Sequence, residues 1–343
     1  MIYTYASSYI SGLGKIVETI LKEKIKDVHI IENLDGLIIY KTNKPLDYKS
    51  FQCFNNTFLV IGFEKTNSNS PFHHSVLSLS KKITVDYINI STAITIKPNI
   101  SFKILCIDKN QPTSIDFSVL TPIEKQIQSK LKMNVGFRKH DLDFVFLRRN
   151  ENIIIFALKL TYNRVTEKQL PKGTLRPELS YLMAYMSDIK KSDIIIDPFC
   201  GRGSIPREIV KNFNYNMIFA SDIDESLVNQ LKLEYKKNKK NLFIKQRDAL
   251  DLSYFEDGFI DKIITDPPWN IFNKTNENFT VFYTKMLSEF NRILKPNGTC
   301  TILMGNIPDF ETSLNNSNFK LIEKFNILVN GKKANVYKLN KVN

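Results

Sequence analysis

One twelve-residue segment, residues 194–205, constrains the fold of this 343-residue chain more than any other part of it. It opens with three isoleucines, continues through a carboxylate at Asp197, and then reads Pro-Phe-Cys-Gly-Arg-Gly-Ser-Ile. An apolar β-branched run, a glycine-rich turn and the start of a helix are typical of a strand–turn–helix unit. Gly201 and Gly203 have no side chain, so a ligand can approach the backbone there. Because a third glycine at the required spacing is missing, the segment is not a dinucleotide-binding fingerprint.

Strand and helix patterns alternate from Asp193 onwards, which predicts a mainly parallel sheet. Asn330-Gly331 lies between two apolar runs near the end of the chain and predicts a two-residue hairpin. Five parallel strands closed by this antiparallel pair give an α/β fold of the Rossmann-like type. The predicted strands are 194–196, 216–220, 243–246, 259–265, 299–304, 319–328 and 334–339, with helices at 225–240 and 278–294.

The first half of the chain has a different, α+β pattern. A strand at 3–7, an amphipathic helix at 15–24 and paired strands at 28–31 and 36–40 are followed by a mixed region between residues 47 and 132. A second hairpin is predicted from strands 142–147 and 152–158. The length of the chain suggests two domains. We therefore expect an amino-terminal domain over 1–165, a junction with a helix over 166–192, and the α/β domain over 193–343.

The run Asp266-Pro267-Pro268-Trp269 follows the predicted strand 259–265. The prolines force the backbone into a rigid turn. That turn holds the Asp266 carboxylate and the Pro267 carbonyl in fixed positions, and both accept hydrogen bonds, as an exocyclic amine on a planar base requires. The ring of Trp269 offers a face for stacking, worth about 1–3 kcal/mol per base. A Pro-Pro-aromatic loop in isolation could equally be a plain surface turn.

Both motifs together resemble those of S-adenosylmethionine-dependent methyltransferases that modify exocyclic amines of nucleobases. Those enzymes carry D-P-F-C-G-S-G-T-I and D/N-P-P-Y/F/W. The junction Gly173-Thr-Leu-Arg176-Pro-Glu-Leu and the strand–helix–hairpin pattern of residues 3–40 are similar to THUMP-containing RNA methyltransferases. The resemblance implies a seven-stranded methyltransferase sheet preceded by a THUMP-like RNA-binding module. It also implies methylation of the N2 amine of a guanosine in tRNA.

The resemblance also implies roles for individual residues. Asp222 ends the second strand, where an acid binds ribose hydroxyls, with Asp224 as the alternative. Asp248 follows the third strand and would accept from the adenine amino group; taken singly, each aspartate would be a helix cap or turn residue. The expected cofactor-binding residues are Asp197, Pro198, Phe199, Cys200, Gly201, Gly203, Asp222, Asp248 and Ala249. The expected catalytic residues are Asp266, Pro267, Pro268 and Trp269, with substrate contacts from Arg176, Arg202 and Asn270.

Transfer in such a site is a direct in-line step. Hydrogen bonds from the target amine to Asp266 and Pro267 would localise its lone pair and stabilise the charge that develops on it. A cysteine nucleophile is not needed, so Cys200 is expected to be a small buried residue. Methylation of pyrimidine carbon 5, which does need a nucleophile, is therefore disfavoured.

The net charge of +13 and the pI near 9.3 favour a polyanionic partner, although an AT-rich genome also produces lysine-rich chains. Basic groups at 138–140, 148–149 and 236–240 are candidates for phosphate contacts. Four cysteines without C-x-x-C pairing suit a reducing cytoplasm, and with only four histidines no zinc site is expected. We expect no transmembrane helix and no signal peptide.

Two alternatives remain open at this point. Trp269 stands where Tyr is usual, and Trp is found in adenine-N6 enzymes, so the substrate could be an adenine in another RNA or in DNA. Arg202 also departs from the usual Ser or Thr of its motif. The second alternative is an inactive RNA-binding protein with a methyltransferase fold. The four intact aspartates, Asp197, Asp222, Asp248 and Asp266, argue against that alternative.

Overall fold

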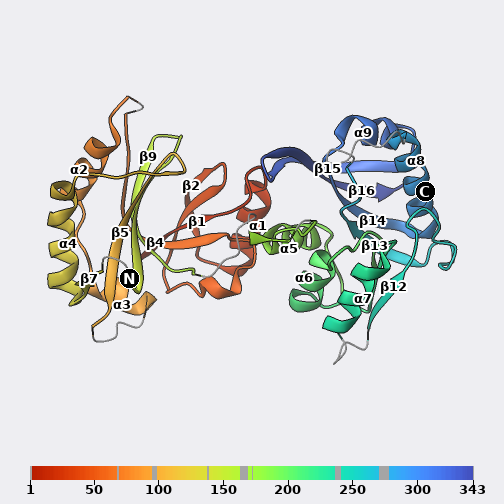
Figure 1. The fold of residues 1–343 in the computed structure, drawn as a ribbon, viewed down its shortest axis with the longest axis horizontal. Coiled ribbons are helices and arrows are strands. Elements are labelled where there is room, and N and C mark those ends of the chain that lie inside the picture. Colours follow the sequence, from red (N-terminus) through yellow and green to blue (C-terminus); the bar gives the residue numbers. More distant parts are fainter. Residues whose placement is uncertain are drawn as a thin grey trace. The chain divides into compact units, whose positions relative to one another are not determined.

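The strand–turn–helix unit at residues 194–205 lies at the centre of a seven-stranded sheet in the computed structural model of the chain. The strand order is β12-β11-β10-β13-β14-β16-β15 (Figure 1). The first five strands are parallel to one another, and β16 runs antiparallel to both β14 and β15. The predicted α/β class and the closing antiparallel hairpin are confirmed. The strand bounds are β10 Ile194–Asp197, β11 Met217–Asp222, β12 Leu242–Gln246, β13 Ile260–Thr265, β14 Leu294–Met304, β15 Phe319–Val329 and β16 Lys332–Lys341.

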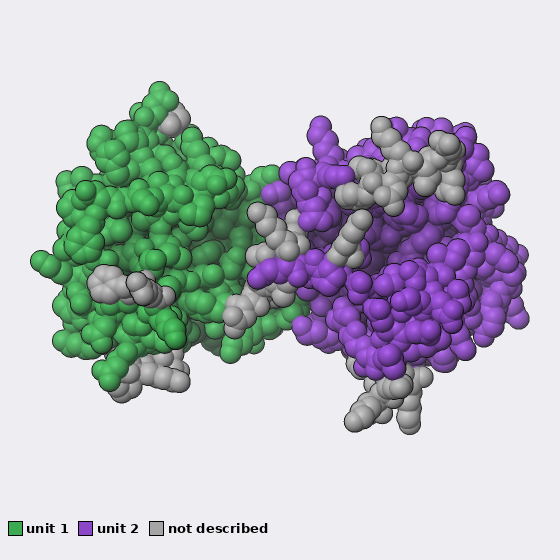
Figure 2. Space-filling model, in the orientation of Figure 1, with its two compact units in different colours: residues 1–9, 17–164 green, residues 10–16, 165–343 purple. Residues whose placement is uncertain are grey.

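The structure describes residues 2–67, 69–94, 99–136, 139–162, 169–171, 173–235, 241–269 and 278–342. The chain divides into two compact units (Figure 2). Unit 1 contains Met1–Tyr9 and Val17–Arg164, and unit 2 contains Ile10–Ile16 and Val165–Asn343. The inclusion of residues 10–16 in unit 2 is not predicted by the sequence.

Helices flank the sheet of unit 2, with α5, α6 and α7 on one side and α8 and α9 on the other in Figure 1. Side-chain caps set where two of them begin. The Asp224 carboxylate accepts from the N–H groups of Ser226 and Leu227 at the start of α7, and Asn278 accepts from Val281 at the start of α8. The bounds are α5 Pro177–Met186, α6 Ser204–Asn212, α7 Glu225–Glu234, α8 Phe279–Ile293 and α9 Ile307–Asn315.

Strand β14 begins five residues earlier than the sequence predicts. Leu294 pairs with Ile260 and Thr299 pairs with Lys262, so residues 295–298 bulge out between two paired positions. The hairpin between β15 and β16 follows the prediction. Asn330 and Gly331 both have positive φ, 52° and 74°, as a type I′ turn requires.

Unit 1 contains a sheet of order β2-β3-β1-β4-β9-β8-β5-β6, with β7 beside β5. Both hairpins predicted there are confirmed, because β2 pairs with β3 and β8 pairs with β9. The region that the sequence left as mixed contains β4, β5 and the helices α2 to α4, and α2 packs on β4, β9 and α4. The bounds are β1 Tyr3–Ser8, α1 Gly14–Lys24, β2 His29–Leu34, β3 Leu37–Thr42, a 3-10 turn Tyr48–Ser50, β4 Asn56–Lys65, α2 Phe72–Lys82, α3 Tyr87–Ala93, β5 Ser101–Asp108, β6 Gln111–Pro112, α4 Phe117–Leu131, β7 Asn134–Val135, β8 Leu142–Arg148 and β9 Ile153–Lys159.

The described residues lack two features, a membrane-spanning helix and a metal-binding cluster. They contain no helix that is both long and apolar enough to cross a membrane. They also contain no group of three or more His, Cys, Asp or Glu side chains arranged to hold a metal ion.

Candidate active site

Four aspartates lie at one edge of the unit 2 sheet. Asp197 and Asp222 are the last residues of β10 and β11, Asp266 directly follows β13, and Asp248 follows β12 by two residues. These strands are consecutive neighbours in the sheet and run parallel, so their carboxyl ends meet at the same edge. Ligands of open α/β sheets bind at that edge.

Asp197 is almost fully buried, with 1% of its surface exposed. Its Oδ1 accepts a hydrogen bond from the Thr265 hydroxyl at 2.7 Å and one from the Phe199 N–H at 3.3 Å. Burial raises the pKa of this carboxyl to about 8, the two hydrogen bonds lower it, and the charges of Asp266 and Asp222 raise it further. The interaction with both aspartates shows that the three carboxyl groups form one electrostatic cluster.

Asp222 fixes the glycine turn that follows β10. Its Oδ2 accepts from the Gly201 N–H at 2.8 Å, and its Oδ1 accepts from the Asp224 N–H at 3.0 Å. Gly201 has a φ of 49°, and a Cβ added there would meet only the Gly173 carbonyl oxygen, at 3.9 Å. The backbone at Gly201 is therefore open to a ligand, as the sequence predicts for this position.

Gly203 has a different physical reason for being glycine. A Cβ at this position would lie 2.4 Å from the Leu231 Cδ1 on α7, and its φ is 79°. Close packing of α6 against α7 therefore requires this glycine. The neighbouring Cys200 is buried as expected, with 5% exposed, and burial raises the pKa of its thiol well above the usual range. Such a thiol is a poor nucleophile at neutral pH.

Asp224 and Asp248 lie in exposed turns. Asp224 caps α7, which agrees with its role as a helix cap rather than a ribose ligand. Asp248 is exposed, and its Oδ1 accepts from the Leu250 N–H at 2.9 Å. Ala249 beside it is buried, with 3% exposed. Asp248 is thus held by its own turn at the edge of the site.

The Asp266 loop is pinned at both ends. Asp266 is half-buried, and its Oδ1 accepts from the indole N–H of Trp269 at 2.8 Å. The Pro268 carbonyl accepts from the Tyr283 hydroxyl at 2.7 Å. Burial raises the pKa of Asp266 to about 7, and the Trp269 hydrogen bond lowers it. Only 9% of Trp269 is exposed, so its ring differs from the open stacking face expected from the sequence.

The junction segment packs on the glycine turn. The Leu175 N–H donates to the Ser204 hydroxyl at 3.2 Å, and the Gly173 carbonyl lies over Gly201. Arg176 forms an ion pair of 3.4 Å with the buried Glu178. The exposed Arg202 donates to Gln230 at 3.2 Å on α7. Asn270, the third expected substrate contact, lies outside the described residues.

The basic groups proposed from the sequence are partly used inside unit 1. Arg148 is buried and donates twice to the Asp108 carboxylate, at 2.7 Å each. Arg149 donates to the Asp35 carbonyl at 2.7 Å. These bonds leave less of either guanidinium for a phosphate. Residues 138 and 236–240 lie outside the described part of the chain, and Lys139 and His140 lie within it.

The carboxylates and the open glycine turn at this edge suit a ligand that carries positive charge and hydroxyl groups. In the described ranges, no lysine or arginine forms an ion pair with Asp197, Asp222 or Asp266. Ser221, next to Asp222, has a buried hydroxyl oxygen without a hydrogen-bond partner among those same residues. S-adenosylmethionine, with its cationic sulfur and its ribose, fits carboxylates and an open glycine turn of this kind.

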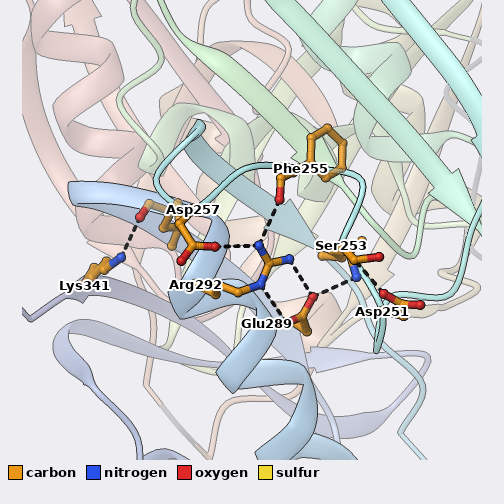
Figure 3. A network of polar contacts seen from close by, with 9 residues as sticks. Asp251, Ser253, Phe255, Asp257, Glu289, Arg292 and Lys341 are labelled. Atoms are coloured by element: carbon orange, nitrogen blue, oxygen red, sulfur yellow. Dashed lines mark hydrogen bonds and ion pairs between the residues drawn. The ribbon is translucent and has the colours of Figure 1, made fainter.

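A polar clamp, Glu289 and Arg292 of α8, holds the loop after Ala249 (Figure 3). The Glu289 Oε2 accepts from the Leu252 N–H at 2.8 Å. Arg292 donates to both Glu289 oxygens at 2.9 Å, to the Phe255 carbonyl at 2.9 Å and to Asp257 at 2.8 Å. The bonds to Arg292 lower the pKa of Glu289. The clamp thus sets the path of the chain that leaves the Asp248 turn.

Comparisons with known proteins give a consistent family. The model of the family described as "RMKL-like, methyltransferase domain" matches residues 164–335. A mouse protein named tRNA (guanine(6)-N(2))-methyltransferase THUMP3 is 25% identical over 194 residues, which cover 52% of this chain and 38% of the relative. A tRNA (guanine(10)-N2)-dimethyltransferase of Methanocaldococcus jannaschii is 28% identical over 195 residues, covering 51% of this chain and 54% of the relative. The chain thus spans about half or less of these two relatives.

The fold of this chain is similar to that of a solved structure over the whole length of both. The crystal structure of TrmN from Thermus thermophilus aligns with a TM-score of 0.77 and covers 99% of this chain and 100% of that one. The sequence identity in this alignment is 15%, so the similarity concerns the fold. It includes unit 1 as well as the methyltransferase sheet.

The clamp makes a stability prediction. We expect Glu289→Ala to lower the free energy of unfolding by about 1–3 kcal/mol, because the Leu252 N–H and Arg292 lose their acceptor. Asp257→Ala is the matched control: its side chain is 80% exposed, and such a surface pair contributes about 0–1 kcal/mol. Urea unfolding of both variants measures the difference. Equal losses in the two variants would contradict the clamp.

Proposed function

Because the chain belongs to the family of RMKL-like methyltransferase domains, we propose that it transfers a methyl group from S-adenosylmethionine to the N2 amine of a guanosine in tRNA. The observation that carries the proposal is the half-buried Asp266 on a Pro-Pro turn, beside Asp197 and Asp222 at the carboxyl edge of the sheet. The names of the two relatives above, which both specify guanine N2 in tRNA, support the choice of base and RNA.

The proposed cofactor residues lie around the glycine turn. The open backbone at Gly201, the Asp222 carboxylate and the Asp248-Ala249 turn would hold the ribose and adenine. Asp197, Pro198, Phe199, Cys200 and Gly203 shape the turn itself. When bound, S-adenosylmethionine supplies an electrophilic methyl group on a positively charged sulfur. The neighbouring carboxylates favour that charge.

The protein's own contribution to the reaction is orientation and charge. The Asp266 Oδ2 and the Pro267 carbonyl each accept a hydrogen bond from one N–H group of the target amine. These bonds localise the lone pair on the nitrogen. As positive charge develops on that nitrogen, the Asp266 carboxylate stabilises it. Holding the amine about 3–3.5 Å from the methyl group supplies much of the rate. The methylated nitrogen then carries the positive charge and loses one of its own two protons to solvent, which restores its conjugation with the ring.

We assign RNA binding to unit 1 together with substrate contacts near the site. The net charge of +13 supports a polyanionic partner. Arg202 is exposed on the glycine turn, Arg176 belongs to the junction segment that packs on this turn, and Asn270 follows Trp269 in the sequence. The guanosine would have to be unstacked or flipped out of its stem to reach Asp266. A reducing compartment such as the cytoplasm suits four cysteines that remain free thiols.

A transfer assay tests the function directly. The protein would be incubated with labelled S-adenosylmethionine and total tRNA from a strain that lacks it, and the nucleosides would be separated by mass spectrometry. We expect N2-methylguanosine. N6-methyladenosine would overturn the assignment of the base. The absence of any methylated nucleoside, with DNA and ribosomal RNA also blank, would overturn the enzymatic function.

Removal of the carboxylate gives the sharpest single-residue prediction. We expect Asp266→Ala to slow single-turnover methylation several hundredfold, equivalent to about 3–4 kcal/mol of transition-state stabilisation. Asp224→Ala is the matched control, because it removes an exposed cap and should cost about 1 kcal/mol of stability with little change in turnover. Full activity of Asp266→Ala would exclude the proposed role.

The pKa of Asp266, raised to about 7, predicts a pH dependence with a definite sign. Only the ionised carboxylate stabilises positive charge on the amine, and roughly a tenth is ionised at about pH 6. The single-turnover rate should therefore rise about tenfold per pH unit below neutrality and level off above about pH 8. Single-turnover rates measured at subsaturating substrate report the ionisation of the free enzyme and check the prediction over this range. A flat profile would contradict it.

A further inference from the structure

The indole ring of Trp269 occupies the space beside Gly305, where any other residue would place its side chain. A Cβ added to Gly305 would lie 2.1 Å from Cε3 and 2.4 Å from Cδ2 of the indole ring. Gly305 directly follows β14, the neighbour of β13 in the sheet. Any side chain at position 305 would therefore displace the indole. The ring is packed against backbone, which accounts for its 9% exposure.

The polar edge of the ring is directed at Asp266. The indole N–H donates to Oδ1 at 2.8 Å, across a separation of three residues. In the described part of the chain, no other donor to Asp266 is seen, so Oδ2 is the oxygen available to a substrate amine.

The turn between these two residues is fixed independently. The Tyr283 hydroxyl donates to the Pro268 carbonyl at 2.7 Å, and Tyr283 is fully buried. Asn306, next to Gly305, donates to Asp309 at 2.8 Å, close to the same tyrosine. The loop therefore does not depend on the indole hydrogen bond alone for its conformation. That bond has a separate effect, which falls on the carboxylate.

From this geometry we infer that Trp269 is a positioning residue: its N–H orients the Asp266 carboxylate and favours its ionised form. The role in methyl transfer rests on the proposed function, whereas the contact between indole and carboxylate does not. A Phe ring at this position would keep the packing on Gly305 and lose the donor. A Tyr ring would carry its hydroxyl at a different place.

Trp269 is the single tryptophan of the chain, so its fluorescence reports on Asp266 without any substrate. We expect the emission of the wild-type protein to titrate with a midpoint near the pKa of about 7 of Asp266. The titration should vanish in Asp266→Asn and Gly305→Ala. Among the described residues, the other titratable groups near Asp266 are Asp197 on β10 and Tyr283 on α8, with Asp222 on β11 beyond Asp197. Tyr283→Phe is the matched control and should keep the titration.

The pH–rate profile tests the same inference in the reaction. In the Trp269→Phe variant, loss of the donor should move the acid limb of the pH–rate profile to higher pH by about one unit. The rate should then fall about fivefold at about pH 7 and recover at higher pH. Tyr283→Phe removes a buried hydrogen bond of the same loop and should leave the midpoint in place. Melting curves of each variant confirm that it is folded.

Two results would overturn the inference. One is wild-type fluorescence that does not titrate, or that titrates unchanged in Asp266→Asn. The other is a Trp269→Phe profile whose midpoint stays in place, with the rate lowered equally at every pH. A wild-type protein that methylates no nucleoside would remove the proposed function, and the fluorescence titration would still decide the contact.

Discussion

Burial of carboxyl groups at the carboxyl edge of a parallel sheet is the constraint on which the site depends. A charged carboxylate in the interior is costly unless hydrogen bonds and nearby positive charge compensate it. The protein supplies at least one donor to each: Thr265 to Asp197, the Gly201 N–H to Asp222, and the Trp269 indole to Asp266. The remaining compensation is left to a cationic ligand. The glycine turn, the Pro-Pro loop and the indole slot all follow from the need to hold these groups close together.

Local patterns predicted much of this arrangement. The apolar run before Asp197, the Asn-Gly hairpin, the strand that ends at Asp222 and the strand just before Asp266 are each determined by residues near in sequence. Their order along the chain predicts a shared edge, because parallel strands place their carboxyl ends together. The aspartates at this edge could therefore be named before the structure. The burial that raises the pKa of Asp197 to about 8 could not, because it depends on the packing of several elements.

Contacts between distant parts of the sequence account for what the sequence could not predict. Leu252 is held by Glu289 across 37 residues, and strand β5 pairs in parallel with β8 only after α4 intervenes. Arg148 illustrates the same limit. Its charge suggests an RNA contact, but its partner Asp108 lies 40 residues away and takes up two of its N–H groups. The sequence shows how many charged side chains the chain has, whereas only the fold shows which of them already form ion pairs within the protein.

Trp269, the fourth residue of the Asp-Pro-Pro-Trp motif, shows most clearly what the sequence could not predict. Taken from sequence, Trp269 preserves an aromatic ring and so resembles the adenine-N6 enzymes, which made the base ambiguous. In the structure the ring is buried against Gly305 and its N–H is bonded to Asp266. These two contacts give Trp269 a role that does not depend on whether the target base is guanine or adenine. A tryptophan at position 269 is therefore accounted for without an adenine substrate.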